Sequence, residues 1–369
     1  MSEQVHISRI GHRGDGMGEG ENGPVFVPFT LAGETVTIER DGNRGHLVAI
    51  ENESVERVTP ACRHFGTCGG CALQMLSLDG NRALKKRFVA DALQQHCPDI
   101  PTDNIIDETI GAEPGERRRA ILTARKIQGG VELGYHARQS KRIIDIEECP
   151  VLVPEIARRL DALREIVAKL RSRKQPARLT VLASETGLDV DIADVWPVEP
   201  GPRLQADLVA ICRRAGIARL TIAGELAVKL ADPLLTVAGI AVKPQPAAFA
   251  QAAATAAGVM SDLVCNHLAS SKSVADLFCG FGTFALALAP TCRVHAVEMD
   301  SDALAALSES VRHASGLKAV SMERRDLSRF PLSARELDRF DAAVFDPPRA
   351  GARAQAEEMA ASKIRRIAA

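Results

Sequence analysis

The sequence has no long hydrophobic run, and its 369 residues carry a net charge of only −1. A membrane helix needs about 20 consecutive apolar residues, and a secretory signal needs an apolar core that the start MSEQVHISRIGHRGDG does not have. We therefore expect a cytoplasmic protein with no membrane association. Because the small net charge creates no global field, any binding to nucleic acid must depend on local basic patches.

Aromatic residues are also scarce. The chain has one Trp and one Tyr, which leaves few side chains on which bases could stack. We find no internal repeat and no low-complexity linker. Nine cysteines in a reducing compartment are not expected to form a disulfide framework, so closely spaced cysteines point to a metal or to catalysis.

The pattern along the chain suggests three domains. Short apolar runs broken by Gly turns predict a small antiparallel β-barrel over residues 1–59, and its excess of acidic residues would repel phosphate. Residues 60–243 predict a central α+β domain, with a partly basic helix at 81–96 and a basic hairpin at 117–146. Strands alternate with helices over residues 244–369, which predicts a parallel α/β sheet.

The last domain can be read element by element. An alanine-rich helix is expected over residues 249–269, followed by the strands SVADLF, RVHAVE, KAVSM and DAAVF. The final segment, from Gly351, is expected to be a helix that runs to the C-terminus.

Three cysteines lie close together in CRHFGTCGGC: Cys62, Cys68 and Cys71. Gly69 and Gly70 would let the backbone fold around a bulky centre. Soft thiolates select zinc or iron–sulfur, and zinc sites usually take cysteines in two close pairs, whereas this chain has no second pair. The pattern favours an iron–sulfur cluster with one distant ligand.

The fourth ligand could come from any of the remaining cysteines, which are Cys97, Cys149, Cys212, Cys265, Cys279 and Cys292. We expect Cys149, because it follows the hairpin in Glu148-Cys149-Pro150, where the proline would hold a rigid turn. The alternative is that the three clustered cysteines are buried thiols with no metal.

In the α/β domain, Asp276 leads from a strand into the turn CGFGT and then into a helix. Such a turn places backbone N–H groups and a carboxylate around a nucleotide-like ligand. The third glycine of the dinucleotide fingerprint is missing, whereas S-adenosylmethionine has no phosphate and needs only a looser turn. The alternative is that Gly280 and Gly282 only permit close packing.

Three further acids follow successive strands. Glu298 ends the second strand, where it could accept from ribose hydroxyls; Asp326 follows the third, where it could meet an adenine amine. Asp346 opens the stretch DPPR after the fourth. These positions point to one crevice at the carboxyl ends of the strands. Other acids nearby, Asp300 and Asp302, could simply cap a helix.

With these motifs assembled, the chain resembles the iron–sulfur branch of the RNA 5-methyluridine methyltransferases, which act on ribosomal RNA. The resemblance covers nearly all 369 residues. It implies an N-terminal TRAM domain of OB-like fold, a central iron–sulfur domain and a Rossmann-like methyltransferase domain that binds S-adenosylmethionine. The implied [4Fe–4S] ligands are Cys62, Cys68, Cys71 and Cys149.

The same resemblance implies the residues that bind the methyl donor. They are Gln251, Asp276, Phe278, Gly280, Gly282, Thr283, Glu298, Asp326 and Asp346. We expect the protein to be a monomer whose partner is RNA, above all 23S rRNA. Because the barrel is acidic, we expect basic residues elsewhere to contact RNA, namely Arg117, Arg118, Arg119, Lys141 and Arg142.

The family's chemistry, as the resemblance implies it, is covalent. A cysteine thiolate adds to carbon 6 of uracil, carbon 5 attacks the sulfonium methyl group, a base removes the carbon 5 proton and the cysteine leaves. That cysteine stands in Ser-Cys-Asn-Pro on the fifth strand. Here the sequence ends at KIRRIAA, where that strand should begin, so we expect a C-terminally truncated, inactive chain whose strand DAAVF is an exposed edge.

Other functions are less consistent with the motifs. A non-catalytic RNA-binding iron–sulfur protein that keeps the donor-binding fold is the main alternative. An amino-group methyltransferase usually has an aromatic residue where this chain has Arg349. A radical S-adenosylmethionine methylthiotransferase has a different cysteine spacing, and its barrel follows the catalytic core.

Overall fold

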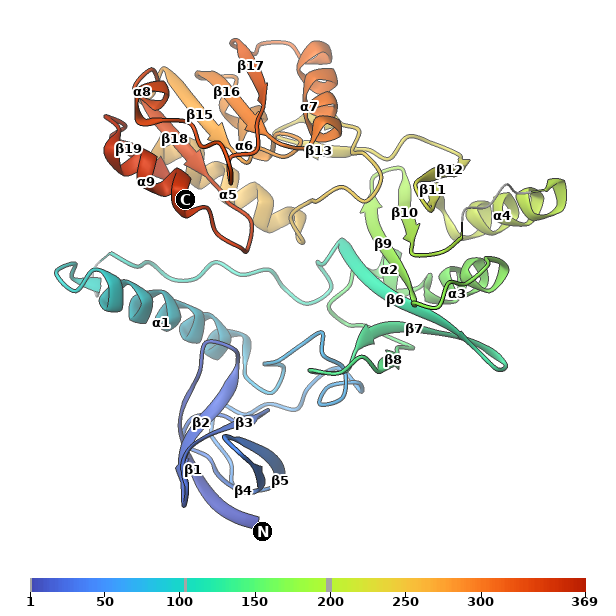
Figure 1. Cartoon of the computed structure of the whole chain (residues 1–369), viewed down its shortest axis with the longest axis vertical. Helices are drawn as coiled ribbons and strands as arrows, with labels where there is room; N and C mark the ends of the chain where they lie inside the picture. The colour runs from blue at the N-terminus through green and yellow to red at the C-terminus, as the bar shows by residue number, and fades with distance from the viewer. Residues whose placement is uncertain (1, 103–104, 197–200) are drawn as a thin grey trace. The chain divides into compact units, whose positions relative to one another are not determined.

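The computed structural model describes two compact units of the chain (Figure 1). The described residues are 2–102, 105–196 and 201–369. The first unit comprises Met1–Glu113 and Glu132–Pro150, and the second comprises Pro114–Val131 and Val151–Ala369. None of the described helices combines the length and the hydrophobicity required to traverse a lipid bilayer.

The first unit begins with a closed five-stranded barrel, which confirms the predicted small β-barrel. Its strand order is β1-β2-β3-β5-β4, and the pairing of β3 with β5 is parallel rather than antiparallel. Alternating apolar residues, among them Ile7, Val27 and Ile38, point inward and are fully buried. The strands are β1 (Ser2–Ile10), β2 (Asp15–Gly20), β3 (Gly23–Pro28), β4 (Thr35–Asp41) and β5 (Arg44–Asn52).

The rest of the first unit contains one long helix and two short strands. These are α1 (Leu78–His96), β7 (Gly130–His136) and β8 (Ile143–Asp145). Helix α1 starts three residues before the predicted position because the Ser77 hydroxyl caps it, accepting from the Gly80 amide at 3.1 Å. Met75 and Leu84 pack with Leu31, which joins this segment to the barrel.

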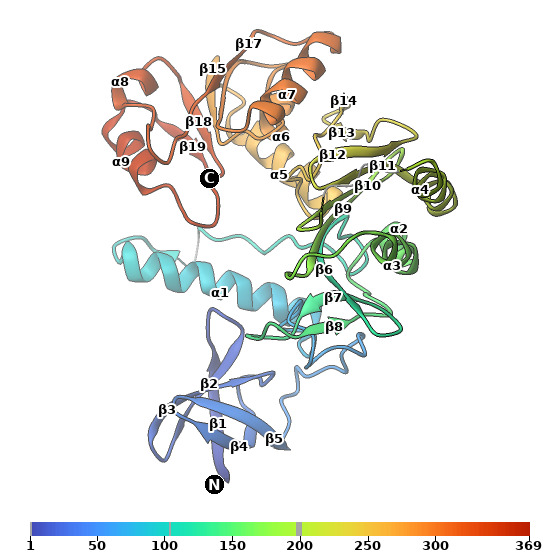
Figure 2. The same cartoon turned by 45° about the vertical axis from the view of Figure 1, so that its right-hand side comes forward.

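The second unit contains a mixed sheet in which five neighbouring strands follow the order β12-β11-β10-β9-β6. They are β6 (Arg119–Ile127), β9 (Ala177–Ser184), β10 (Gly187–Ala193), β11 (Ile217–Ile222) and β12 (Glu225–Lys229). Three helices cover it: α2 (Pro154–Ala157), α3 (Leu160–Lys169) and α4 (Pro202–Ala215). Figure 2 shows α3 and α4 side by side, where they bury Leu163, Ile166 and Ile211.

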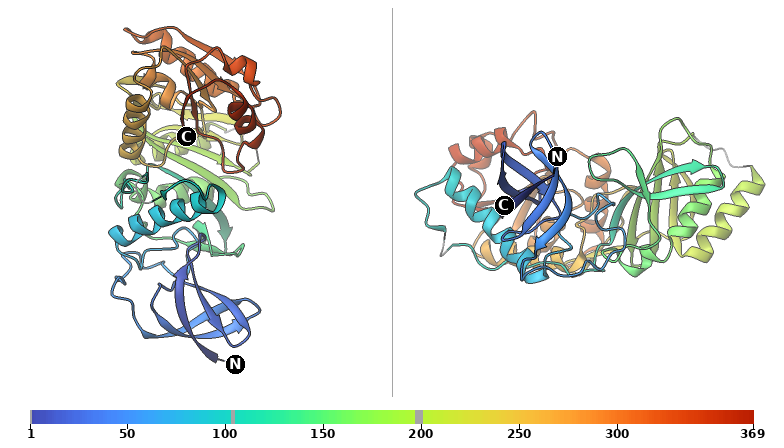
Figure 3. Two further views of the ribbon diagram at one scale, coloured as in Figure 1. Left: turned by 90° about the vertical axis from the view of Figure 1, so that its left-hand side faces the viewer. Right: turned by 90° about the horizontal axis from the view of Figure 1, so that it is seen from below.

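The second unit ends in a parallel sheet, β17-β16-β15-β18-β19, preceded by a small antiparallel pair. Figure 3 draws this last part of the chain in yellow to red. Its strands are β13 (Leu235–Val237), β14 (Ile240–Val242), β15 (Ser273–Leu277), β16 (Arg293–Glu298), β17 (Val320–Arg324), β18 (Ala342–Phe345) and β19 (Arg366–Ala368). The helices are α5 (Ala254–His267), α6 (Thr283–Leu288), α7 (Ser301–His313), α8 (Ala334–Leu337) and α9 (Arg353–Ala361). Separate apolar clusters cover the two faces of the sheet, so the predicted α/β architecture is confirmed.

Two predictions for the end of the chain are wrong. The expected C-terminal helix stops at Ala361, and residues 366–368 form β19, which runs parallel to β18. The stretch DAAVF is therefore not an exposed edge, since Ala342 pairs with Arg366 and Val344 pairs with Ala368. An alanine-rich composition favours helix only weakly, and pairing with an open strand edge overrides that preference here.

Candidate functional site

The carboxyl ends of four strands meet at one edge of the parallel sheet. β16 and β17 lie on one side of β15, and β18 and β19 lie on the other, so the strand order reverses at β15. Phe278, Glu298, Asp326 and Asp346 all lie at or just after the ends of β15 to β18. The structure thus gathers these four predicted residues at the switch point, where open α/β sheets bind ligands.

The turn after β15 has an unusual backbone. Phe278, Gly280 and Gly282 all have positive φ, at 63°, 55° and 98°. A Cβ on Gly282 would lie 2.4 Å from Leu307 Cδ1 of α7, so this glycine serves close packing. A Cβ on Gly280 would meet nothing within 4 Å. Packing therefore explains Gly282 but not Gly280, whose side faces open space beside the strand ends.

Glu298 ties the turn to the next strand. Its carboxylate accepts the Gly280 amide at 3.0 Å, the Met299 amide at 2.7 Å and the Asp300 amide at 3.0 Å. Asp300 caps α7 by accepting from the Asp302 amide at 2.8 Å, so the alternative of a helix cap holds for Asp300. Glu298 is held in place mainly by main-chain donors, with its charge facing the site.

Several carboxylates that have no cationic partner among the described residues converge at this edge. Asp276 is only 1% exposed, and neither of its carboxylate oxygens has a hydrogen-bond partner in the structure. Burial is the main cause that raises the pKa of Asp276 to about 8; the neighbouring Ala285 amide acts in the opposite direction, and the charges of Asp346 and Glu298 act in the same direction as burial. Burial also raises the pKa of Asp346, although the Gln251 side-chain amide donates to it at 3.3 Å. An edge of this kind suits a cationic ligand.

The other predicted residues lie at the rim. Thr283 opens α6 and is half-buried. Asp326 accepts the Ser328 amide at 3.0 Å and lies 3.6 Å from Arg329 Nε. The Phe278 and Phe345 rings lie 6.1 Å apart at the ends of the two central strands. Both rings are partly buried and pack against the apolar cluster on one face of the sheet.

Two of the arginines expected to contact RNA hold the segment that carries Gln251. Arg118 donates from Nε to the Gln251 carbonyl at 3.2 Å, and its amide donates to the Ala252 carbonyl at 2.7 Å. Arg119 Nε donates to the Ala248 carbonyl at 2.9 Å. Burial lowers the pKa of both guanidinium groups. This role could not be predicted from the sequence, because the partners lie some 130 positions away.

The remaining basic candidates are exposed. Arg117 is exposed, and its backbone pairs with Val151 and Val153 through bonds of 3.0 Å. Lys141 and Arg142 lie in the turn between β7 and β8, and both side chains are exposed to solvent.

The four cysteines predicted as cluster ligands belong to the first unit, and all are half-buried. Burial raises the pKa of the Cys68 thiol, and interaction with Cys71 and Cys62 raises it further, so these three thiols lie near one another. A Cβ on Gly70 would lie 3.4 Å from Cys68 Sγ. Among the described residues, however, no three His, Cys, Asp or Glu side chains are arranged to hold a metal ion.

The segment before Cys149 is bonded to the segment that follows Cys62. Arg63 pairs with Glu147 at 2.8 Å and with Glu148 at 3.1 Å. The Glu147 amide donates to His64 Nε2 at 3.3 Å. These contacts connect the two parts of the chain that carry the first and the distant cysteine.

Comparison with known proteins shows what the chain is similar to. No protein-family profile matches it. It is 45% identical to an uncharacterized RNA methyltransferase of Rhizobium meliloti, over 99% of this chain and 88% of the relative. It is 33% identical to the 23S rRNA (uracil(1939)-C(5))-methyltransferase of Pseudomonas entomophila, over 95% of this chain and 80% of the relative.

A solved structure shares the fold. The tRNA (uracil-54, C5)-methyltransferase of Pyrococcus abyssi, in complex with S-adenosyl-L-homocysteine, superposes with a TM-score of 0.68 at 18% identity, covering 97% of this chain and 88% of that one. The two relatives at 33% and 45% identity match this chain almost from end to end. The chain therefore belongs to this family of RNA methyltransferases.

Proposed function

We propose that the chain binds S-adenosylmethionine at the carboxyl edge of β15 to β18 and serves in methylation of carbon 5 of a uridine in RNA, with 23S rRNA as the substrate. The observation that carries the proposal is the convergence of Asp276, Glu298 and Asp346 without a cationic partner among the described residues. S-adenosylmethionine carries a sulfonium and an ammonium group, which the Glu298 and Asp346 carboxylates would attract and which would favour ionisation of Asp276. The uracil-C5-methyltransferase relative supports the choice of base.

The proposal assigns specific roles to several of the predicted donor-binding residues. Glu298 would accept from the ribose hydroxyls, and Asp326 would accept from the adenine amine. Gln251 and Asp346, which are already hydrogen-bonded, would face the methionine end. Gly280 leaves open space for the ligand to approach the backbone. Bound S-adenosylmethionine supplies an electrophilic methyl group.

The covalent step needs a thiolate and a base. The thiolate would add to carbon 6, and carbon 5 would take the sulfonium methyl group, which leaves S-adenosylhomocysteine. The base would then take the carbon 5 proton, and the electrons of that C–H bond would re-form the 5,6 double bond and expel the thiolate. Cys279, which lies in the turn, is unsuited because burial raises the pKa of its thiol far above the ordinary value, and Asp276 adds to that effect. The proposal assigns neither the thiolate nor the base to a residue of this chain.

The proposal also includes a [4Fe–4S] cluster on Cys62, Cys68, Cys71 and Cys149, within a central domain of residues 60–243. The donor set suits it, since four half-buried thiols lie in two segments that are bonded together.

The cluster is tested by iron content. Cys149→Ala in anaerobically purified protein should lose most of its iron and its visible absorption. Cys97→Ala is the matched control, because Cys97 is exposed at the end of α1 and should keep both. Equal iron in the two variants would remove Cys149 from the ligand set.

Donor binding is tested by isothermal titration calorimetry with S-adenosylmethionine. Glu298→Gln should weaken binding at least tenfold, because a hydrogen bond to a charged group is worth about 1.5–3 kcal/mol. Asp262→Asn removes an exposed carboxylate on α5 and should leave the affinity unchanged. No binding to the wild-type chain would end the proposal.

Methyl transfer is tested directly on RNA. Ribosomal RNA transcripts containing 5-fluorouridine should trap a covalent protein–RNA adduct when S-adenosylmethionine is present, since fluorine cannot leave as a proton does. Donor and RNA binding without any adduct or methylation would favour the alternative of a non-catalytic RNA-binding protein.

A further inference from the structure

A basic pocket lies in the second unit, on the mixed sheet. Its cavity of about 230 Å³ is lined by residues at the end of β6, in the loop between α3 and β9, and at the end of β10. No lining residue belongs to the parallel sheet. The floor is apolar and buried, formed by Ala124, Val167, Ala177 and Val195.

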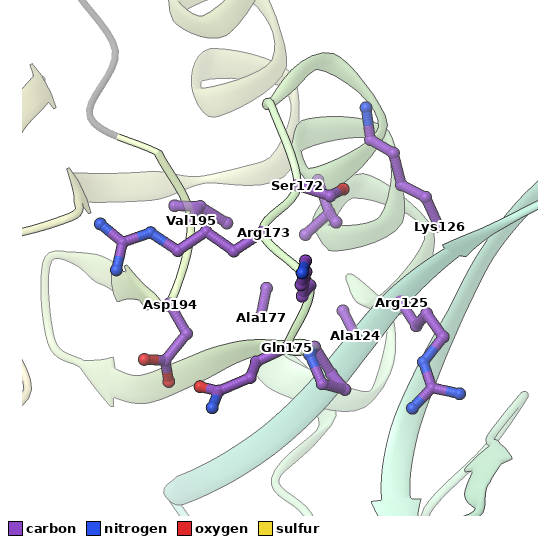
Figure 4. A pocket seen from close by; sticks show the side chains of 12 residues that line it. Ala124, Arg125, Lys126, Ser172, Arg173, Gln175, Ala177, Asp194 and Val195 are labelled. Atoms are coloured by element: carbon purple, nitrogen blue, oxygen red, sulfur yellow. The ribbon is translucent and has the colours of Figure 1, made fainter.

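The rim of this pocket is positively charged. Four basic side chains line it, with a single carboxylate, that of Asp194. Figure 4 shows Arg125 and Lys126 extending in opposite directions from β6, with Arg173 and Asp194 at the other end of the pocket. In the part of the chain that the structure describes, no carboxylate pairs with Arg125, Arg173 or Lys174, and Lys126 donates only to the Ala168 carbonyl.

The only tryptophan of the chain lies beside this rim. Trp196 is 50% exposed, and the Arg173 guanidinium lies 5.0 Å from the centre of its ring. Backbone hydrogen bonds hold Trp196 beside Arg173. Ser172 forms a β-bridge with Val195, and the Trp196 amide donates to the Arg171 carbonyl at 3.2 Å. Half of the Trp196 surface is thus exposed to solvent beside Arg173, which pairs with no carboxylate among the described residues.

We propose that this basic pocket, with Trp196, binds a single-stranded segment of the RNA substrate. Unpaired Arg and Lys side chains neutralise phosphates, and an exposed indole stacks on a base whatever its sequence. A folded protein or an acidic peptide would use the cations but would leave the indole face without a planar partner. The inference rests on RNA being the substrate, and it assigns a contact away from the methyl-donor edge.

The test uses the chain's own fluorescence. Because Trp196 is the only tryptophan, its emission reports this site alone. A single-stranded RNA oligonucleotide should quench it, whereas heparin, which has charge but no bases, should bind without comparable quenching. Trp196→Ala should weaken RNA binding about tenfold in fluorescence anisotropy with labelled RNA, and Trp196→Phe should restore much of it.

A charge-matched pair of double variants tests the cations. Arg173→Ala/Lys174→Ala should weaken RNA binding. The slope of the logarithm of the binding constant against the logarithm of the salt concentration should become less negative by about 1.4, the value for two phosphate contacts on a single strand. Arg293→Ala/Arg312→Ala removes two exposed charges from the parallel-sheet domain and should change neither. Circular dichroism and S-adenosylmethionine binding should be unchanged in both.

Three results would overturn the inference. They are no quenching of Trp196 by RNA, equal quenching by an acidic peptide, and equal RNA affinity for the two double variants. Each can be obtained while the donor still binds at Glu298 and Asp346, so failure here is separate from failure of the proposed function.

Discussion

Asp276 offers the sharpest test of the electrostatics at the strand ends. Its carboxyl group is 1% exposed, unpartnered, and has its pKa raised from 3.8 to about 8. An acid whose pKa is raised on folding binds its proton more tightly in the folded state. It therefore favours folding most below pH 4, and that contribution is lost as the pH rises toward 8.

The magnitude follows from the shift. Between pH 4 and pH 8 the unfolded state is ionised and the folded state is not, which costs about 1.4 kcal/mol of stability per pH unit, or about 6 kcal/mol over the range as an upper estimate. Asp276→Asn removes the titration but buries an unpartnered amide, which costs roughly 1–3 kcal/mol at every pH. The variant should match the wild type near pH 5 and exceed its free energy of unfolding by about 2–4 kcal/mol near pH 8.

Urea unfolding followed by circular dichroism from pH 5 to pH 8 measures this difference. The expected result is a free-energy difference between Asp276→Asn and wild type that grows with pH by about the equivalent of one proton. Asp262→Asn is the control, because its carboxylate is exposed and should give a constant difference. Parallel curves for Asp276→Asn and wild type would refute the claim that Asp276 is protonated in the folded chain at neutral pH.

The remaining predictions concern donor binding and two structural positions. If a cation binds beside Asp276, it favours the ionised carboxylate, so binding of S-adenosylmethionine at pH 7 should release up to one proton. The affinity should therefore rise up to tenfold for each unit by which the pH increases toward 8. Calorimetry in buffers of different ionisation enthalpy measures the proton release, and an affinity that is independent of pH would contradict the prediction. Glu34→Gln leaves the largely buried Arg57 without its ion pair, made at 2.6 Å, and should lower the free energy of unfolding by about 3–5 kcal/mol in urea titrations; a loss below 1 kcal/mol would show that the pair is solvated. Gly282→Ala puts a Cβ 2.4 Å from Leu307 Cδ1 at a φ of 98° and should cost about 2–4 kcal/mol, with the melting temperature as the measurement and Gly280→Ala, where space is open, as the milder comparison.

The sequence predicts the architecture well where the signal is local. Alternation with a period of two predicts the barrel strands, and the change to strand–helix alternation near residue 245 predicts the parallel sheet. The prediction fails at the end of the chain, where residues 366–368 pair with β18. A strand of three residues carries almost no periodicity, and only the neighbouring strand determines it.

Only part of the candidate site could likewise be predicted from the sequence. Glu298, Asp326 and Asp346 can be placed together from sequence, because the carboxyl ends of parallel strands meet at one edge. The unpartnered state of Asp276 cannot be predicted, since it depends on which donors the folded chain fails to supply. The glycines show the same limit: Gly282 is explained by a side chain of α7 that lies 25 positions further along.

Charge patterns in sequence show where cations are, but not which groups they meet. Arg118 and Arg119 occur in the most basic run of the chain, yet in the fold both donate to carbonyls of the segment around Gln251. By contrast, no sequence motif marks Arg173. In the fold it lies beside Trp196, and it lines the same pocket as the basic end of β6, which is some 50 positions earlier in the chain. A half-buried guanidinium that donates to carbonyls has fewer N–H groups free for phosphate than an exposed one that pairs with no described carboxylate. For this chain, RNA contacts should therefore be sought first among such exposed cations next to an aromatic face, and only then in the arginine run at residues 117–119.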